Sequence, residues 1–439
     1  MTNLPKGSKK LLNAWAFYDW ANSVYTLTIA SAVFPIFYEA LFSDRSHYIE
    51  VFGLELKNSA LISFVTAFAF VFVAFFSPLL SGIADYVGNK KSFMKFFCYV
   101  GALSCMGLYW FNLENIYIGL LFYFLGLIGY WGSLVFYNSY LPDIAFPEQQ
   151  DKISAKGYSL GYIGSVILLI INLAMIMKPK IFGITGTDGE AAMKAMRYSF
   201  VMVGVWWILF SQYSYYFLPK GSKETNKKLS NDVVFNGFKE LKKVWAILKD
   251  NIPLKRYLGG FFVSSMAVQT VMLVATYFGA QEITWGSKEE STIGLIICIL
   301  IIQLVAVVGA VLTSRASEKY GNVPTLIVIN SIWAVFCALA FFITLPMHFY
   351  VMATVAGFVM GGIQALSRST YSKLLPETED TASFFSFYDV AEKIGIVIGM
   401  CLYGIIDQIT GSPRLAIVFL GIFFVIAIFL LRRVPKNDL

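Results

Sequence analysis

Hydrophobic residues along this chain fall in long blocks that are separated by short charged or Pro/Gly-rich breaks. Most blocks hold roughly 20–25 residues, enough for a helix that rises 1.5 Å per residue to cross about 30 Å of hydrocarbon. Strands of an outer-membrane barrel would instead give short alternating segments. The blocks predict twelve transmembrane helices, near residues 14–41, 58–84, 92–111, 116–140, 157–177, 197–218, 257–281, 292–314, 323–345, 349–373, 384–409 and 414–432.

The composition indicates an all-α polytopic membrane protein. Hydrophobic residues make up 57% and charged residues 14% of the chain, and the mean hydropathy is +0.66. A soluble domain usually has about 25% charged residues, so this chain is too apolar to be solvated on all sides. None of the five cysteines has a C-x-x-C partner, and the sequence contains no G-x-x-x-x-G-K-[ST] nucleotide loop. We therefore expect no metal site, no cofactor and no enzymatic activity.

The net charge of +7 is distributed asymmetrically, which indicates membrane orientation. Lysine and arginine concentrate in the segments on the side of the N-terminus, and this asymmetry places both termini in the cytoplasm. The expected surroundings are the lipid bilayer, and no nucleic acid is expected as a partner. The compact length is typical of a bacterial protein of the cytoplasmic (inner) membrane, with an organellar membrane as the alternative. We expect a monomer.

The longest polar stretch, residues 219–256, divides the chain into a first six-helix bundle (1–218) and a second (257–439). Within this linker, apolar residues recur at spacings of one, three and four, with lysines between them. The pattern predicts an amphipathic helix that lies along the cytoplasmic interface with its apolar face in the lipid headgroups. A binding site for a regulatory protein is the alternative. The apolar residues are Val234, Phe235, Phe238, Leu241, Val244, Trp245 and Leu248.

The two halves of the chain repeat one another. Residues 81–89, after the second helix, and residues 314–322, after the eighth, both read S-x-x-x-[D/E]-x-x-G-N. The fourth helix ends in Leu-Pro-Asp, at Asp143, where the tenth ends in Leu-Pro-Glu, at Glu377. Matches at nearly one offset indicate that a six-helix unit has been duplicated.

The segment after the second helix resembles the signature loop of the major facilitator superfamily. Asp85, Gly88 and Lys90 match this loop, whereas Ser81 and Tyr86 stand where the signature has Gly and Arg. The resemblance implies a major facilitator fold, in which two pseudo-symmetric six-helix bundles face each other.

Three further segments resemble motifs of the vacuole-effluxer-like branch of that superfamily, which is related to the autophagy-linked vacuolar amino-acid exporters. These segments are residues 13–23, 361–369 and 384–393, and residues 141–143 followed by 157–162 resemble a fourth motif of the branch. The resemblance implies a secondary transporter, with amino acids as the favoured solute and export as the favoured direction.

Charge inside hydrocarbon is costly, so ionisable residues within the predicted helices are candidates for gating or ion coupling. We expect Asp19 and Arg368 to form part of a cytoplasmic gate or a coupling-ion relay. Asp389 and Lys393 are spaced i,i+4, which favours an intrahelical pair whose role is either structural or functional. Glu392 has no evident partner on its own helix and could carry a proton.

Two acidic residues of the repeated loops are further gating candidates. We expect Asp85 to meet the N-terminus of a neighbouring helix or a basic side chain, and so to hold the halves together in one state. Glu318 is its counterpart in the second half. An ordinary charged cytoplasmic turn is the alternative.

Helices one, four, seven and ten line the central cavity in the general facilitator plan. Amide and phenol groups among aromatic rings suit a small polar or zwitterionic solute, although each group could instead form an interhelical hydrogen bond. The candidates for solute binding, with Tyr388 added from the eleventh helix, are Asn22, Tyr25, Tyr130, Trp131, Tyr137, Asn138, Gln269 and Gln364.

The predicted function is secondary active transport of a small polar solute by alternating access, coupled to protons. One alternative is a non-transporting receptor or scaffold on the same fold. The other is a facilitator of a different solute class, such as a peptide, sugar, nucleoside or drug.

Overall fold

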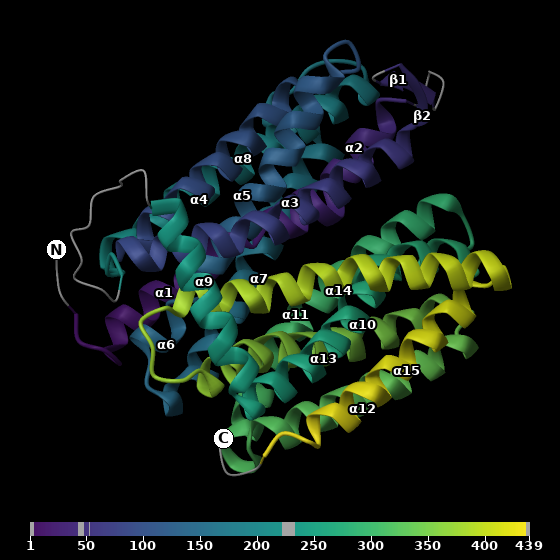
Figure 1. The fold of residues 1–439 in the computed structure, drawn as a ribbon. Coiled ribbons are helices and arrows are strands. Elements are labelled where there is room, and N and C mark those ends of the chain that lie inside the picture. The colour runs from purple at the N-terminus through teal and green to yellow at the C-terminus, as the bar shows by residue number, and fades with distance from the viewer. Residues whose placement is uncertain (1–3, 43–47, 52, 222–232, 436–439) are drawn as a thin grey trace.

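The computed structural model describes residues 4–42, 48–51, 53–221 and 233–435. Its first bundle, called the N-bundle, runs from α1 to α8 (Figure 1). The elements of the N-bundle are α1 (Lys9–Asn22), the π-helical η1 (Tyr25–Ala32), α2 (Val33–Ala40), β1 (Tyr48–Val51), β2 (Leu54–Lys57), α3 (Asn58–Val87), α4 (Lys90–Gly107), η2 (Leu108–Trp110), α5 (Ile116–Asn138), α6 (Leu141–Ile144), α7 (Pro147–Met177), η3 (Pro179–Phe182) and α8 (Asp188–Phe217).

The second bundle, called the C-bundle, follows the linker helix α9 (Val233–Asp250). Residues 222–232 of the predicted linker lie outside the described residues. The elements of the C-bundle are α10 (Ile252–Glu282), α11 (Lys288–Tyr320), α12 (Asn322–Leu339), η4 (Ala340–Phe342), α13 (Pro346–Leu374), α14 (Thr381–Thr410) and α15 (Pro413–Leu431).

Each predicted transmembrane helix corresponds to one long helical segment of the described chain. By length and composition, ten of these segments could cross a membrane. The remaining two, α8 and α14, are 30 residues long and pack within the bundles. Helix α14 contains three charged residues close together in sequence, Asp389, Glu392 and Lys393, and these make that part of the helix less hydrophobic.

The first predicted helix, 14–41, is not one regular α-helix. It consists of α1, the π-helical η1 and α2, because Tyr25–Ala32 takes the wider π turn. Such π segments occur often at functional positions in membrane and soluble helices. The antiparallel strands β1 and β2, which pair Val51 with Leu54 at their turn, were not predicted and join the first span to α3.

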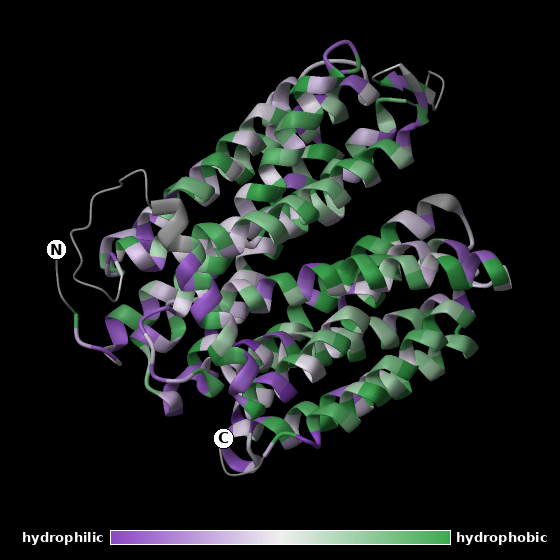
Figure 2. Cartoon of the chain, in the orientation of Figure 1, coloured by the Kyte–Doolittle hydropathy of each residue, from purple (hydrophilic) through white to green (hydrophobic). Residues whose placement is uncertain are grey.

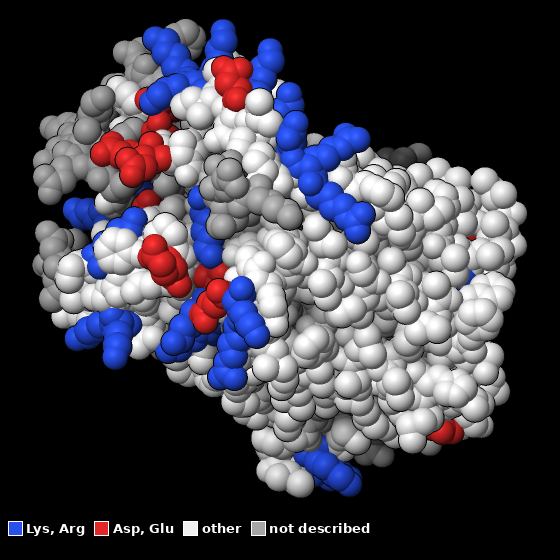
Figure 3. All heavy atoms as spheres, turned by 90° about the horizontal axis from the view of Figure 1, so that it is seen from below, with Lys and Arg blue, Asp and Glu red and all other residues white. Residues whose placement is uncertain are grey.

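Each bundle has its own hydrophobic core. Buried residues from Leu11 to Leu218 form the first core, around Trp207, and those from Val244 to Val434 form most of the second, around Trp333. The outer faces remain apolar: Phe75 is 72% exposed, and large apolar side chains are exposed along most helices. Figure 2 shows that hydrophobic residues predominate along the helices of both bundles. Such a surface suits lipid rather than water. Charged side chains gather at one end of the molecule in Figure 3, beyond which the visible surface is almost free of charge.

Both termini lie at this charged end, which we call the termini end (Figure 1). The bundles meet there and diverge toward the opposite end, which carries β1 and β2. The contacts between bundles pair α3 with α14, and α7 with α11 and α13. The structure is therefore closed at the termini end.

The linker helix α9 lies across α3 and also contacts α10 and α14 (Figure 1). Val244 and Leu248 are buried in the core of the C-bundle, and Leu241 is partly buried. The prediction that the apolar face lies in the headgroups is wrong for these three residues, because the neighbouring helices offer an apolar surface within reach. The side chains of Val234 and Phe235 lie outside the described part.

Candidate functional site

A buried ion pair joins the two bundles at the termini end. Arg368 of α13 is 1% exposed and Asp19 of α1 is 4% exposed. Both terminal guanidinium nitrogens of Arg368 donate to Asp19 Oδ2 at 3.3 Å, across 349 residues of sequence. Tyr137 Oη donates to the same carboxylate oxygen at 2.8 Å. Asp19 and Arg368, which were expected in one gate or relay, are therefore in direct contact, while the gating role stays a prediction.

The rest of the guanidinium is also held by the N-bundle. Arg368 Nε donates to Ser154 Oγ at 3.0 Å, Nη2 to the Ser154 carbonyl at 3.0 Å and Nη1 to Asn138 Oδ1 at 3.2 Å. Its Cζ lies 4.2 Å from the ring centroid of Tyr158 and 4.7 Å from that of Trp15. Desolvated cation–π contacts contribute up to about 2 kcal/mol each. A side chain of the C-bundle is thus enclosed by groups of the N-bundle.

Two glycines of α7 allow α1 to approach this pair. A Cβ on Gly157 would overlap Asp19 Oδ2 and would lie 3.1 Å from Arg368 Nη2. A Cβ on Gly161 would overlap Ser23 Oγ. Gly157 therefore lies directly against the ion pair and Gly161 against Ser23, and at both positions a larger side chain would collide with α1.

A second cluster, which we call the α14 triad, consists of the buried Asp389 and Lys393 and the partly buried Glu392. Lys393 Nζ donates to Asp389 Oδ1 at 2.8 Å and to Glu392 Oε2 at 2.9 Å. The same Nζ lies 3.5 Å from the ring centroid of Trp131, on α5 of the opposite bundle. The predicted i,i+4 pair is confirmed. Its role is not decided by this geometry.

The two carboxylates of the triad differ in their surroundings. Glu392 accepts a bond from Gln269 Nε2 at 2.8 Å as well as the one from Lys393, so the expectation that it lacks a partner on its own helix is wrong. Asp389 is 6% exposed, and its Oδ2 has no hydrogen-bond partner among the described residues. Because two acids share one lysine, the triad has a net charge of −1 when all three side chains are ionised.

Some predicted solute-binding residues surround these clusters. Trp131, Tyr137, Asn138 and Gln269 contact the ion pair or the triad, as described above. Gln364 Oε1 accepts a bond from Tyr162 Oη at 2.6 Å, which links α13 to α7. The ring of Tyr388 stacks on Phe261, with centroids 4.0 Å apart.

The other candidates lie in the interior of the N-bundle. Asn22 is fully buried, and its Nδ2 has no partner among the described residues. Tyr25 stacks on Tyr130, with centroids 4.9 Å apart, and lies against Trp207 of α8. These contacts fit the packing alternative as well as a solute site, so the binding role stays a prediction.

Asp85 binds the N-terminus of α14, as predicted. Its carboxylate accepts bonds from the backbone nitrogen of Ser383 at 2.7 Å, from Ser383 Oγ at 2.7 Å and from the backbone nitrogen of Ala382 at 3.3 Å. The first backbone N–H groups of a helix lack partners within it and carry partial positive charge, so they favour a carboxylate. We call this contact between α3 and α14 the first latch.

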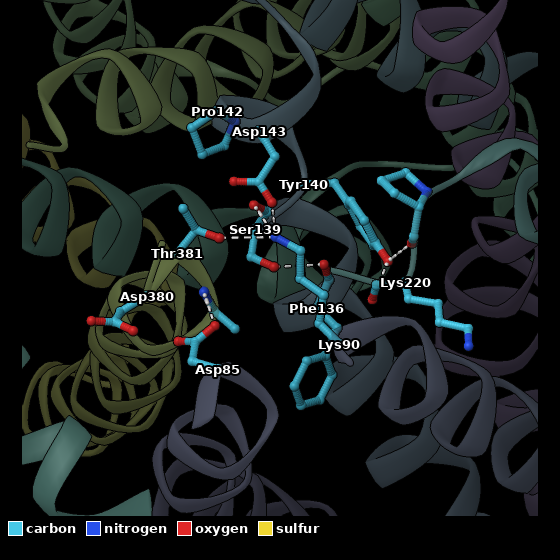
Figure 4. Close-up of polar contacts among 12 residues, drawn as sticks. Asp85, Lys90, Phe136, Ser139, Tyr140, Pro142, Asp143, Lys220, Asp380 and Thr381 are labelled. Carbon is cyan, nitrogen blue, oxygen red and sulfur yellow. Dashed lines mark hydrogen bonds and ion pairs between the residues drawn. The ribbon is translucent and has the colours of Figure 1, made fainter. Parts of the chain in front are cut away.

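Lys90 closes the same region (Figure 4). Its Nζ pairs with Asp143, donates to the Ser139 carbonyl at 3.0 Å and donates to Thr381 Oγ1 at 2.9 Å. Thr381 is the first residue of α14, whereas Ser139 and Asp143 follow α5. Lys90 therefore ties the end of α5 in the N-bundle to the start of α14 in the C-bundle.

A second contact between the bundles, called the second latch, also has its acid on the N-bundle and its partners on the C-bundle. Asp151 of α7 is 3% exposed and accepts bonds from Ser317 Oγ at 2.9 Å, Asn322 Nδ2 at 2.9 Å and Lys373 Nζ at 2.6 Å. Glu318, which was predicted as the counterpart of Asp85, is exposed and makes no hydrogen bond or ion pair with the described residues. That prediction is wrong, because successive helical residues point about 100° apart and it is Ser317 that faces α7.

Comparison with known proteins agrees with this architecture. The family described as "Vacuole effluxer Atg22 like" matches residues 7–438. The MFS-type transporter YxiO of Bacillus subtilis is 31% identical over 432 residues, which cover 97% of this chain and 95% of YxiO. The chain belongs to the vacuole effluxer Atg22-like family.

A more distant relative matches nearly the whole chain, and a solved structure shares the fold. Autophagy-related protein 22 of Kluyveromyces lactis is 24% identical, over 97% of this chain and 93% of the relative. The crystal structure of the Major Facilitator Superfamily transporter FucP in its outward conformation has a TM-score of 0.71 at 12% identity, with 98% and 99% of the two chains covered. The protein is thus a multi-pass membrane transporter of the major facilitator fold, and not an enzyme.

Several residues around Arg368 and in the second latch were not predicted from the sequence. Ser154 was not singled out, because a serine in a helix of mixed composition carries no pattern. Asp151 could have been noticed as an acid in the first turns of α7, a helix whose remaining residues are mainly apolar or small. Tyr158 and Trp15 were not singled out as site residues, because aromatic side chains are common throughout this chain.

Proposed function

We propose that this protein moves a small polar solute, with amino acids favoured, by proton-coupled alternating access. The observation that supports this most is the enclosure of Arg368 of the C-bundle by Asp19, Ser154 and Asn138 of the N-bundle. Since the termini end opens only if the bundles separate there, every opening has to remove Arg368 from these partners. The ion pair is therefore the gate of the transport cycle.

A proton provides a route for opening this gate. Breaking a buried ion pair while leaving either charge unpaired costs about 3–5 kcal/mol. A proton on Asp19 removes one of the two charges, so Arg368 can leave without an unpaired carboxylate remaining behind. Asp19 is thus the proposed coupling site, and Tyr137 keeps its carboxylate in position through the 2.8 Å hydrogen bond.

The α14 triad supports a solute that carries both signs of charge. Lys393 can pair with a carboxylate, and the unpartnered Oδ2 of Asp389 can accept a bond from an ammonium group. Gln269 and Trp131 add an amide group and an aromatic ring beside the triad, and both suit a zwitterionic solute. Export as the direction is supported by the description of the family as a vacuole effluxer.

With both termini in the cytoplasm, the closed termini end corresponds to the outward-facing state. The basic residues that gather at this end support the orientation through the positive-inside tendency. The bacterial relative YxiO supports placement in the cytoplasmic membrane of a bacterium.

The test is transport of labelled amino acids into proteoliposomes with and without an imposed pH gradient. Asp19→Asn should abolish proton-driven uptake and leave the melting temperature close to that of the wild type. The matched control is Asp407→Asn, the same chemical change near the C-terminal end of α14 and away from the site. Unchanged gradient-driven uptake by the Asp19 variant would refute the coupling role.

A further inference from the structure

The linker helix α9 has two different faces. Its inner face, with Val244 and Leu248, is buried against the bundles. Its outer face exposes Phe238 (59%) and Trp245 (55%), which are large apolar side chains that the protein itself leaves uncovered. Lys242 and Lys249 are exposed as well.

These four exposed residues form one stripe. Phe238, Lys242, Trp245 and Lys249 are separated by four, three and four positions, so they lie on the same side of a helix with 3.6 residues per turn. Aromatic rings alternate with ammonium groups along this stripe. Aromatic side chains are enriched at the depth of lipid headgroups, and lysines near that depth are attracted by anionic lipids.

The charge of α9 favours an anionic ligand. The helix contains four lysines and two acidic residues. One of the acids, Glu240, is paired with Lys243 at 3.5 Å. Lys242 and Lys249 form no ion pair with the residues that the structure describes. Their charges are thus available to a ligand outside the protein.

Helix α9 is connected to the first latch through Lys243, whose side chain is 58% exposed. Lys243 Nζ donates to Asp380 Oδ2 at 3.0 Å, and Asp380 immediately precedes α14. The next residues along the chain bind Lys90 and Asp85, as described above. The ring of Trp245 also lies against Phe387 of α14, with centroids 5.5 Å apart. A ligand that holds α9 in place therefore also holds the start of α14 against the N-bundle.

We propose that the Phe238–Lys242–Trp245–Lys249 stripe binds anionic phospholipid headgroups of the leaflet at the termini end, and that this binding stabilises the closed latch. The rings enter the headgroup region, and the two lysines pair with lipid phosphates. The bound lipid favours the state in which α14 contacts α3. Anionic lipid is thus a regulator of the gate, acting outside the solute pathway.

The binding test uses the full-length protein in neutral detergent. Phosphatidylglycerol is titrated while the thermal midpoint is recorded, and phosphatidylcholine is the neutral control. One lysine near a charged lipid surface contributes an attraction equivalent to about fivefold in affinity. The double variant Lys242→Gln/Lys249→Gln should therefore bind phosphatidylglycerol about 25-fold more weakly. The matched control, Lys178→Gln/Lys180→Gln, removes two exposed lysines around η3 and should bind like the wild type.

The gating test uses spin labels at exposed Glu148 and Lys319, on the N- and C-bundles at the termini end, with exposed Cys401 replaced by serine. Double electron–electron resonance in nanodiscs should show a larger closed population with phosphatidylglycerol than with phosphatidylcholine alone. The difference should disappear in the Lys242/Lys249 variant and persist in the control.

The proposal would be overturned if the wild type and the Lys242/Lys249 variant bound phosphatidylglycerol with equal affinity. It would also be overturned if the closed population were the same with phosphatidylglycerol as with phosphatidylcholine alone. Capture of a soluble protein by α9 without lipid sensitivity would also overturn it. Neither arm requires solute, so failure of this proposal is distinguishable from failure of the proposed transport.

Discussion

The substitution Gly157→Ala tests the gate without changing any charge. The added Cβ would overlap Asp19 Oδ2 and would lie 3.1 Å from Arg368 Nη2 and 3.2 Å from Tyr137 Oη. Because the Asp19 carboxylate is the end of a side chain, it can move, but only by leaving the donors that hold it. We therefore expect the fold to persist and the ion pair to weaken.

The magnitude follows from the bonds that are disturbed. A hydrogen bond to a charged group contributes about 1.5–3 kcal/mol. Loss of one such contact in the closed state shifts the equilibrium toward opening of the termini end by about 10- to 150-fold. Alanine is also the better helix former by about 1 kcal/mol, so global stability should change little.

The assay is the distance distribution between the spin labels at Glu148 and Lys319, together with the melting temperature. Gly259→Ala on α10 is the matched control, because a Cβ there meets no atom within 4 Å. A Gly157 variant with the closed population of this control would refute the argument that the ion pair holds the gate.

Three further results are expected. Lys393→Met leaves the buried carboxylate of Asp389 and the partly buried one of Glu392 without their cation, so the melting curve should show a loss of about 3–5 kcal/mol in stability. Asp85→Asn and Asp151→Asn should each raise the open population in the spin-label assay, and Glu318→Gln should not. The pKa of Lys243 is raised by its hydrogen bond to Asp380. A raised pKa means that this contact is fully present below the ordinary range of lysine and is lost only as pH rises through the raised value. Protease protection of α9 should therefore stay constant between about pH 6 and 9, and a decline within that range would contradict the pairing.

The order of the helices, the duplication and the scarce buried charges could all be predicted from the sequence. Hydrocarbon makes polar groups so costly that Asp19, Arg368 and Lys393 stand out in apolar blocks without any knowledge of the fold. The i,i+4 pair on α14 was also predictable, because both partners belong to one helix and its geometry is regular. The contact of Asp85 with a helix N-terminus followed from the resemblance of its loop.

Only the tertiary structure decided which groups meet across the bundles. Asp19 and Arg368 are 349 residues apart, and a hydrophobic pattern reports which side of a helix is buried but not which neighbour covers it. The second latch could not be predicted for the same reason. Neighbouring residues of a helix point in different directions, and in α11 it is Ser317 that faces α7, where Asp151 supplies the acid, whereas Glu318 points away. For α9, the sequence determined an amphipathic helix, whereas the proximity of apolar helix surfaces decided that its apolar face packs on protein and its aromatic–lysine stripe remains exposed.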